Sequence, residues 1–345
     1  MRLSDLARGL IAVLLLTQHA TAFEVEEEHL FVGGAARAEL SVLSTTDIDI
    51  AAPLVAAFLA ARPDLSLRYT MASSQEVFRA IADEGAAFDL VISSAMDLQM
   101  KLANDGFASP HASDAATALP PWARWRDRLF GFALEPVVTI VSRRGLEGLP
   151  IPETRRDLIA LLRENPDRFR GRIATYDPHA SGVGYMFATQ DARQTDAFWR
   201  LAEVMGRLDA RLYCCSVDMI EDLAAGRVFV AYNVVGSYAA THARRIPDAA
   251  VIELQDFSLA LLRSALIPVT AARPDLGAAF LDFLIGAEGQ RISRGDTGFP
   301  PLTEGAIQLS AHIRPIRLDP GLLVPLDRLT RRNFLREWDA AMTQP

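Results

Sequence analysis

The sequence predicts an α/β protein with largely parallel sheets. Apolar, β-branched runs of strand length recur along the chain, and each is followed by a stretch whose apolar residues have helical spacing. The chain has 345 residues and is 50% hydrophobic, so it can bury a large core in two domains of ordinary size.

In the first third of the chain, strands are expected at residues 39–47, 65–71 and 88–96, with helices at 50–61, 73–83 and 97–103. Hydroxyl side chains end or follow each of these strands. Ligands in open α/β sheets bind beyond the carboxyl ends of the strands, so we expect a cleft at this edge. Its predicted lining is Thr45, Thr46, Ser73, Ser74, Ser93 and Ser94. Each hydroxyl taken alone is also a common helix cap.

The same alternation continues in the second half. Strands are expected at residues 136–144, 172–176, 228–233 and 259–269, and helices at 154–163, 217–225 and 276–285. The strand at 228–233 ends in Tyr232 and Asn233, which we also place at the cleft.

The stretch DPHASGVGYMFATQ, residues 177–190, places a Ser-Gly-Val-Gly turn between a strand and a helix that begins near Gly182. Backbone N–H groups at a helix start are unpaired and carry partial positive charge, so they suit an anion. The expected anion contacts are the hydroxyl of Ser181 and the N–H groups of Gly182, Val183 and Gly184. An ordinary serine N-cap is the alternative.

The amino terminus has the layout of a secretory signal peptide. Arg2 and Arg8 precede or flank an apolar run at residues 10–16, and Ala20-Thr21-Ala22 precedes Phe23. We expect residues 1–22 to be removed after Ala22 and the mature protein to be soluble and exported. The net charge of −8 does not suggest a basic face, so nucleic acid is not an expected partner.

The sequence predicts neither a metal site nor a cofactor. The six histidines are scattered and have no zinc-like spacing with the two cysteines, Cys214 and Cys215. These cysteines are adjacent, and two buried small side chains are favoured over a strained vicinal disulfide.

The order of the motifs resembles that of bacterial periplasmic solute-binding proteins. The matching stretches are residues 51–69, 88–95, 134–144, the Ser-Gly turn, residues 224–233 and residues 278–292. The similarity covers residues 40–292 and is to the branch that contains ferric-ion, phosphoglycerate and aminoethylphosphonate binding proteins.

This resemblance implies a two-lobed periplasmic binding protein fold of type II, with two crossing strands as the hinge. We place the crossings near residues 134–142 and 259–267. Lobe 1 then comprises residues 23–133 plus 264–312, lobe 2 residues 134–263, and a helical tail at 313–345 packs on the lobes. A monomer that closes around its ligand is expected.

The resemblance also implies a function without catalysis: capture of a small anionic solute for import by an ABC transporter through a membrane permease. The anion would be a phosphonate or a phosphorylated or carboxylated organic compound. One alternative is a ligand-sensing partner of a two-component sensor kinase. Another is ferric-ion binding, which is less favoured because Gly236 and Ser237 align with the two iron-binding tyrosines of the ferric members.

Three side chains keep two interpretations each. Glu135 either receives the ammonium group of a zwitterion, such as an aminophosphonate, or forms a salt bridge with Arg263. Ser216 either adds a second contact to the anion or only caps the helix that follows it. Ser181 with His179 could be called a nucleophile and base, but two residues of separation in a loop do not place the imidazole on the hydroxyl.

Overall fold

The computed structural model describes residues 23–296, 299–300, 302 and 311–343. The predicted signal peptide and its cleavage site after Ala22 lie outside the described residues. Among the helices that are described, none combines the length and the hydropathy needed to cross a membrane.

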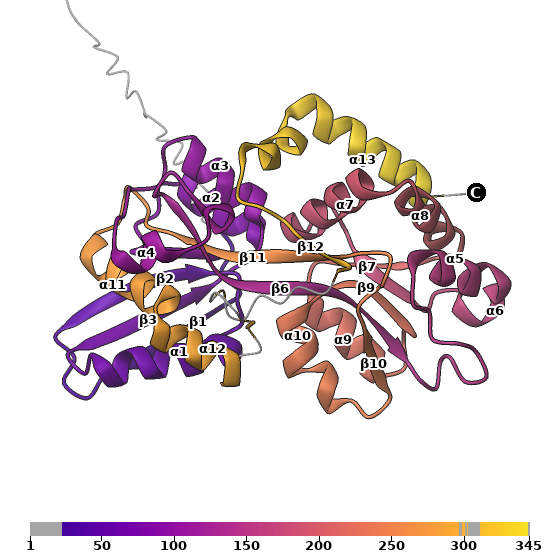
Figure 1. Cartoon of the computed structure of the whole chain (residues 1–345), viewed down its shortest axis with the longest axis horizontal. Helices are drawn as coiled ribbons and strands as arrows, with labels where there is room; N and C mark the ends of the chain where they lie inside the picture. The colour runs from indigo at the N-terminus through magenta and orange to yellow at the C-terminus, as the bar shows by residue number, and fades with distance from the viewer. Residues whose placement is uncertain (1–22, 297–298, 301, 303–310, 344–345) are drawn as a thin grey trace, which may run out of the picture.

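One group of strands and helices occupies the left of Figure 1. Its strands are β1 (Glu27–Val32), β2 (Ala38–Ser44), β3 (Leu65–Met71) and β4 (Leu90–Ser93). Its helices are α1 (Ile48–Ala61), α2 (Ser74–Ala82), α3 (Met96–Asn104), α4 (Asp114–Ala118), η1 (Pro121–Ala123), α11 (Pro274–Ile285) and α12 (Ala287–Asp296). β2 pairs in parallel with β3 and β4, and β1 lies antiparallel along β3. The strands predicted in the first third of the chain are confirmed.

The second group occupies the right of Figure 1. Its strands are β7 (Ile173–Tyr176), β8 (Arg211–Tyr213), β9 (Val230–Val235) and β10 (Ala249–Ile252). Its helices are α5 (Arg155–Glu164), α6 (Pro166–Phe169), α7 (Gly182–Gln194), α8 (Ala197–Arg207), α9 (Ser216–Ala224), α10 (Gly236–Thr241) and η2 (Ala243–Arg245). β7 pairs in parallel with both β8 and β9, so both groups contain parallel strands with their carboxyl ends at one edge.

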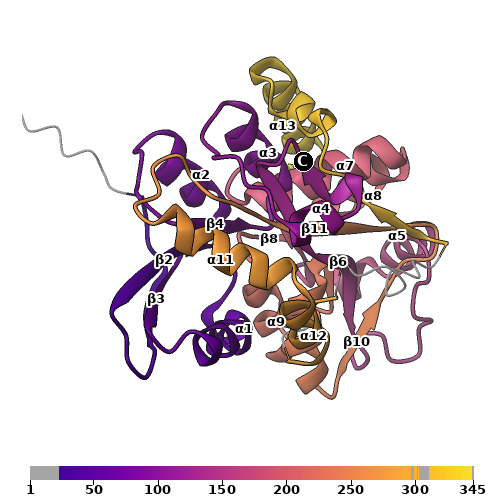
Figure 2. The ribbon, with the colours of Figure 1, turned by 60° about the vertical axis from the view of Figure 1, so that its left-hand side comes forward.

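Two long antiparallel strands, β6 (Leu129–Ser142) and β11 (Ser258–Leu266), run between the two groups (Figures 1 and 2). β11 pairs with β4, whereas β6 continues beyond β11 and pairs with β9 and β10. The short strands β5 (Arg124–Trp125) and β12 (Ile313–Pro315) lie along β6 and β11. The described strands thus form one sheet with the order β1-β3-β2-β4-β11-β6-β9-β7-β8. This arrangement confirms the predicted α/β fold with crossing strands.

The C-terminal segment reaches across both groups at the top of Figure 1. η3 (Pro320–Leu326) lies against α3, and α13 (Arg328–Met342) packs on α8. The ring of Phe198 stacks on Trp338 and Phe334 at centroid distances of 6.1 and 6.3 Å. The residue boundaries assigned above to the lobes and the tail stay predictions.

Glu135 of β6 and Arg263 of β11 form a buried ion pair where the two long strands lie side by side. Arg263 Nε lies 2.7 Å from Glu135 Oε1, and both side chains are 0% exposed. Arg263 also donates from Nη1 to Thr46 Oγ1, just before α1. The backbone N–H of Ser237 in α10 donates to Glu135 Oε2 at 3.3 Å. The pair therefore joins both long strands to elements of both groups.

We expect Glu135→Gln to lower the free energy of unfolding by about 3–5 kcal/mol, because it leaves the buried guanidinium without a counter-charge. Urea denaturation measures this loss. Asp209→Asn is the matched control: its pair with Arg170 is solvated, with side chains 67% and 56% exposed. The free energy of unfolding of this control variant should fall by less than about 1 kcal/mol. Equal losses in the two variants would show that the buried pair does not hold the strands.

Candidate functional site

A cavity of about 210 Å³ lies between the two groups of elements. From the first group it is lined by Glu26, Thr45, Asp47, Met71, Ala72, Ser73, Ser74 and Ser94. From the second group it is lined by Tyr176, Ala180, Ser181, Val183, Cys214, Cys215, Ser216, Val217, Asp218, Val235 and Tyr238. Most of these residues end or follow β2, β3, β4, β7, β8 and β9. The cavity therefore lies where the strand pattern predicts the cleft.

Of the six hydroxyl residues predicted after the first three strands, four reach the cavity: Thr45, Ser73, Ser74 and Ser94. Thr45 and Ser94 come from neighbouring strand ends, and Thr45 Oγ1 accepts from the N–H of Ser94 at 3.1 Å. Ser73 caps α2, because its hydroxyl accepts from the N–H of Glu76 at 3.3 Å. A capping hydroxyl keeps its own proton, so Ser73 can still donate to a ligand.

Thr46 and Ser93 do not line the cavity, which corrects the expectation for these two residues. The hydroxyl of Thr46 accepts from Arg263. Ser93 is 2% exposed and accepts from the N–H of Ala95 at 3.1 Å. Successive side chains at the end of a strand point to opposite sides. Thr45 and Ser94 therefore face the cavity, while their neighbours Thr46 and Ser93 face the protein interior.

The Ser-Gly turn contributes Ser181 and Val183 to the cavity, but not Gly182 or Gly184. Ser181 is the N-cap of α7, and its hydroxyl accepts from the N–H of Gly184 at 3.2 Å. That N–H group already has a partner in the helix cap, and its predicted contact with an anion stays a prediction. The turn is therefore both a helix cap and one wall of the cavity.

The two glycines of the turn are needed for packing. A Cβ atom at Gly182 would lie 2.6 Å from Ser74 Oγ and 2.9 Å from Leu98 Cδ1, across the gap between the two groups. A Cβ atom at Gly184 would collide with the side chain of Tyr176, within the second group. Gly182 therefore allows α7 to approach α2 and α3, and Gly184 allows α7 to lie on β7.

Ser216 lines the cavity but is not an N-cap, since α9 begins at Ser216 and its N-cap is Cys215. The hydroxyl of Ser216 lies 2.5 Å from Tyr176 Oη and accepts from the N–H of Val235 at 3.2 Å. Burial raises the pKa of Tyr176 above its ordinary value, so its hydroxyl is protonated. Ser216 thereby fixes the start of α9 against the ends of β7 and β9.

Tyr232 and Asn233 lie away from the cavity, contrary to the prediction. Both donate to Asp191 Oδ2, at 2.7 and 2.8 Å, and Asp191 pairs with Arg155 at 2.9 Å. Asp191 is 0% exposed, so this is a buried network that supports the second group.

Glu135 is also absent from the lining of the cavity. It forms the ion pair with Arg263, which is the second of its two interpretations.

Three carboxyl groups line the cavity that the sequence analysis did not select: Glu26, Asp47 and Asp218. Partial burial is the main cause that raises the pKa of each. Repulsion from Asp47 also raises the pKa of Glu26, and repulsion from Glu221, Asp222 and Asp47 raises that of Asp218. Among the cavity's lining residues in the described part of the chain there is no Lys, Arg or His. The side chains thus favour a cationic or proton-donating group.

Helix starts surround the same cavity. Its lining includes the N-cap residues of α1, α2, α7, α9 and α10, which are Asp47, Ser73, Ser181, Cys215 and Val235. The first N–H groups of a helix carry partial positive charge and attract anions. The backbone therefore favours an anionic group in a cavity whose charged side chains are acidic.

Asp47 also joins the two sides of the cavity. Tyr238, on α10, donates to Asp47 Oδ1 at 2.7 Å, and Asp47 makes no side-chain cap to its own helix. Nearby, Gln75 Nε2 on α2 donates to the backbone oxygen of His179 at 2.9 Å. The position of Asp47 at the carboxyl end of the predicted strand at 39–47 was the signal that could have identified it. Glu26 and Tyr238 had no such signal.

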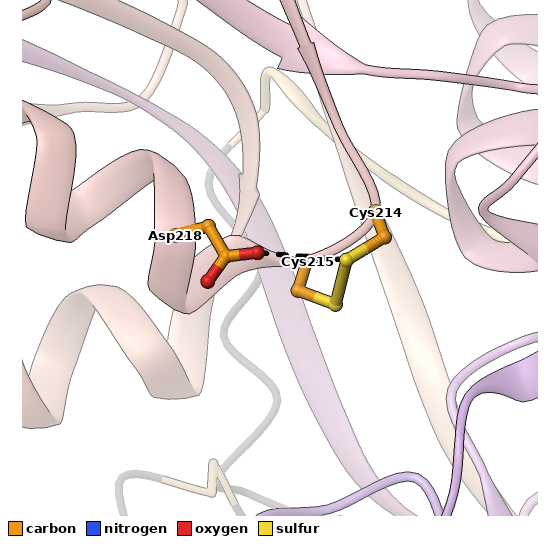
Figure 3. Close-up of side chains that lie close together, drawn as sticks. All are labelled: Cys214, Cys215 and Asp218. Atoms are coloured by element: carbon orange, nitrogen blue, oxygen red, sulfur yellow. Dashed lines mark hydrogen bonds between the residues drawn. A yellow bond between two sulfur atoms is a disulfide. The ribbon is translucent and has the colours of Figure 1, made fainter. Parts of the chain in front are cut away.

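Cys214 and Cys215 form a disulfide at the edge of the cavity, beside Asp218 (Figure 3). Cys214 is exposed and Cys215 is half-buried, so the expectation of two buried, unlinked side chains is wrong. Cys214 Sγ lies 3.5 Å from Asp218 Oδ2. A disulfide sulfur carries no proton, so this approach is a contact and not a hydrogen bond.

In the described part of the chain, the imidazole of His179 is not paired with the hydroxyl of Ser181 as a base with a nucleophile. His179 Nε2 lies 2.7 Å from Asp339 Oδ1 on α13. The positions aligned with the iron-binding tyrosines, Gly236 and Ser237, begin α10, and Ser237 is 0% exposed.

Comparisons with known proteins agree with this architecture. Residues 40–299 match the family described as bacterial extracellular solute-binding protein. The substrate binding protein of an ABC transporter from Agrobacterium tumefaciens is 31% identical, with a TM-score of 0.87, covering 92% of this chain and 98% of that chain. No curated protein matches the chain significantly.

Two further structures are similar in fold. The periplasmic binding protein AfuA from Actinobacillus pleuropneumoniae, with fructose-6-phosphate bound, is 15% identical, with a TM-score of 0.73 over 90% of this chain and 100% of that chain. Iron-bound HitA from Pseudomonas aeruginosa is 16% identical, with a TM-score of 0.67 over 88% of this chain and 99% of that chain.

The two glycines of the turn should respond differently to substitution. Gly184→Ala creates a clash inside the second group, so we expect the free energy of unfolding to fall by about 1–3 kcal/mol. In Gly182→Ala the new methyl group clashes only with the first group of elements. The two groups can move apart to relieve this clash, so the free energy of unfolding should fall by less than about 0.5 kcal/mol. Urea denaturation compares them. Equal losses would show that α7 packs permanently on α2 and α3.

Proposed function

We propose that this chain, which belongs to the bacterial extracellular solute-binding proteins of the ABC transporter type, captures a small zwitterion in the cavity between its two groups of elements. The anionic end would be a phosphonate, phosphate or carboxylate, as the Ser-Gly turn suggests. The other end would be an amine. The observation that supports this choice above all is the coexistence of acidic side chains and helix N-termini in one cavity.

The amine would lie against the carboxylates. Asp47 and Asp218 come from opposite sides of the cavity, and Glu26 adds a third negative charge. An ammonium group relieves the mutual repulsion that raises the pKa of Glu26, and it satisfies carboxylates that are partly removed from water. An anion without an amine would face these charges unshielded, so the acids argue against a simple anion.

The anionic end would lie at the starts of α7 and α9. Ser181 caps α7 through its lone pairs and can still donate its hydroxyl proton to an anion. α9 has no side-chain cap, which leaves its first N–H groups without a side-chain acceptor. Ser74 and Ser94 supply further hydroxyl groups from the opposite wall. Each such contact to a charged group contributes about 1.5–3 kcal/mol.

Delivery to a membrane permease is the proposed outcome of capture. Binding between two groups of elements that are linked by two strands favours the closed arrangement, which a partner protein can distinguish from the open one. Presentation to a sensor kinase would use the same closed arrangement. Permease and ATPase genes beside the gene for this chain would support import, and a two-component pair without them would support sensing.

A thermal-shift and calorimetry screen with matched analogues tests the zwitterion proposal. We expect 2-aminoethylphosphonate or a related amino acid to stabilise the protein, by about 2.7 kcal/mol at 100 times its dissociation constant. Ethylphosphonate lacks the amine and ethanolamine lacks the anion, so each should bind at least about tenfold more weakly. Phosphorylated three-carbon acids, dicarboxylates and ferric salts complete the screen. Equal binding of ethylphosphonate and its amino analogue would contradict the proposal.

Asp218→Asn then locates the amine. The substitution should raise the dissociation constant of the amine-bearing ligand by about tenfold or more. The dissociation constant of the amine-free analogue should stay unchanged or fall. Glu221→Gln is the matched control, because Glu221 lies on the same helix, is exposed and does not line the cavity. An equal effect of both variants on both ligands would mean that Asp218 acts only through the overall charge.

A further inference from the structure

We infer that the Cys214–Cys215 disulfide is a ligand-facing wall of the cavity whose reduction weakens binding. The inference deepens the function proposed above and rests on it where Asp218 is concerned. Cys214 and Cys215 are the only two cysteines in the sequence, and both line the cavity. No other disulfide competes with this one in determining how the chain responds to a reductant.

The disulfide adds little to the stability of the whole fold. A disulfide stabilises a protein mainly by closing a loop of the unfolded chain, and this one joins neighbouring residues. Cys214 is exposed and Cys215 is half-buried, so the pair is not packed in a core. The position of the pair in the cavity, and not global stability, is therefore its distinguishing feature.

The disulfide restrains the turn between β8 and α9. It closes a small covalent ring that includes the peptide bond between the two cysteines, and Cys215 is the N-cap of α9. The side chain of Cys215 makes no cap to the helix. The covalent ring thus holds in place the first N–H groups of α9, which begins at Ser216. The anionic end of a ligand is proposed to bind at these groups.

The disulfide also keeps Asp218 available. Figure 3 shows the carboxylate of Asp218 directed at the disulfide, with Cys214 Sγ 3.5 Å from Asp218 Oδ2. In the oxidised state that sulfur has no proton to give, so the carboxylate stays an acceptor without a partner there. Reduction would convert Cys214 into a thiol whose S–H can donate to Asp218. The carboxylate would then be engaged inside the protein, in competition with the amine of the ligand.

The reaction is an ordinary thiol–disulfide exchange. A dithiol reductant supplies two electrons and two protons, the S–S bond breaks, both cysteines become thiols, and the reductant becomes a cyclic disulfide. Exported proteins meet an oxidising compartment, where disulfides persist, so the oxidised, binding-competent state would be the resident one. An exposed disulfide is accessible to reductant.

Calorimetry on the full mature chain with 2-aminoethylphosphonate tests the inference. The oxidised protein is compared with protein reduced by dithiothreitol, whose thiols are counted. We expect reduction to weaken binding by about tenfold or more, with little change in the melting temperature. Unchanged affinity would overturn the inference. A large fall in melting temperature would also overturn it, because the disulfide would then be a structural staple.

Two double variants separate the two effects. The variant with Cys214→Ala and Cys215→Ala loses the restraint but offers no proton to Asp218. The variant with Cys214→Ser and Cys215→Ser loses the restraint and offers a hydroxyl. The serine variant should bind 2-aminoethylphosphonate more weakly than the alanine variant. Equal affinity of both variants and the oxidised wild type would overturn the inference.

Hydrogen exchange distinguishes failure of this inference from failure of the proposed ligand class. If no zwitterion binds the oxidised protein, the ligand class is wrong, and the restraint can still be measured without ligand. Amides of residues 215–218 should then exchange faster in the reduced protein and in both double variants, while amides of β6 and β11 stay unchanged. Unchanged exchange at residues 215–218 would overturn the inference by itself.

Discussion

The buried ion pair between Glu135 and Arg263 determines how the two long strands meet, and the cavity is arranged around that meeting point. Neither charge has access to water, so each depends on the other and on Thr46 and Ser237 for its remaining hydrogen bonds. Those two partners stand at the starts of α1 and α10. The pair therefore sets the positions of helix starts that lie on opposite sides of the cavity.

Around this centre the protein combines two kinds of electrostatic partner. Helix N-termini supply fixed positive potential that costs no ionisable side chain, and Glu26, Asp47 and Asp218 supply negative charge. A ligand with separated charges can satisfy both at once. The hydrogen bond from Tyr238 to Asp47 and the close approach of α7 to α2 at Gly182 join the two walls, so the proposed closure and the proposed ligand capture would involve the same surfaces.

Much of the fold could be predicted because strand and helix periodicities are local, and the hydroxyl residues at strand ends located the cavity. The choice between adjacent residues could not be made in the same way. Thr45 faces the cavity while Thr46 holds Arg263, because alternation along a strand is known only once its register is fixed. The acidic side chains of the cavity could not be predicted either, since Glu26 and Asp218 reach it only through tertiary packing.

A crystal structure of the protein with the best ligand of the screen tests the central claim most directly, because it shows both ends of the ligand in one experiment. The account predicts the anionic group within hydrogen-bonding distance of N–H groups at the starts of α7 and α9, and the amine on Asp47 or Asp218. A ligand bound outside this cavity, or a metal ion held by the carboxylates with no organic molecule present, would contradict it.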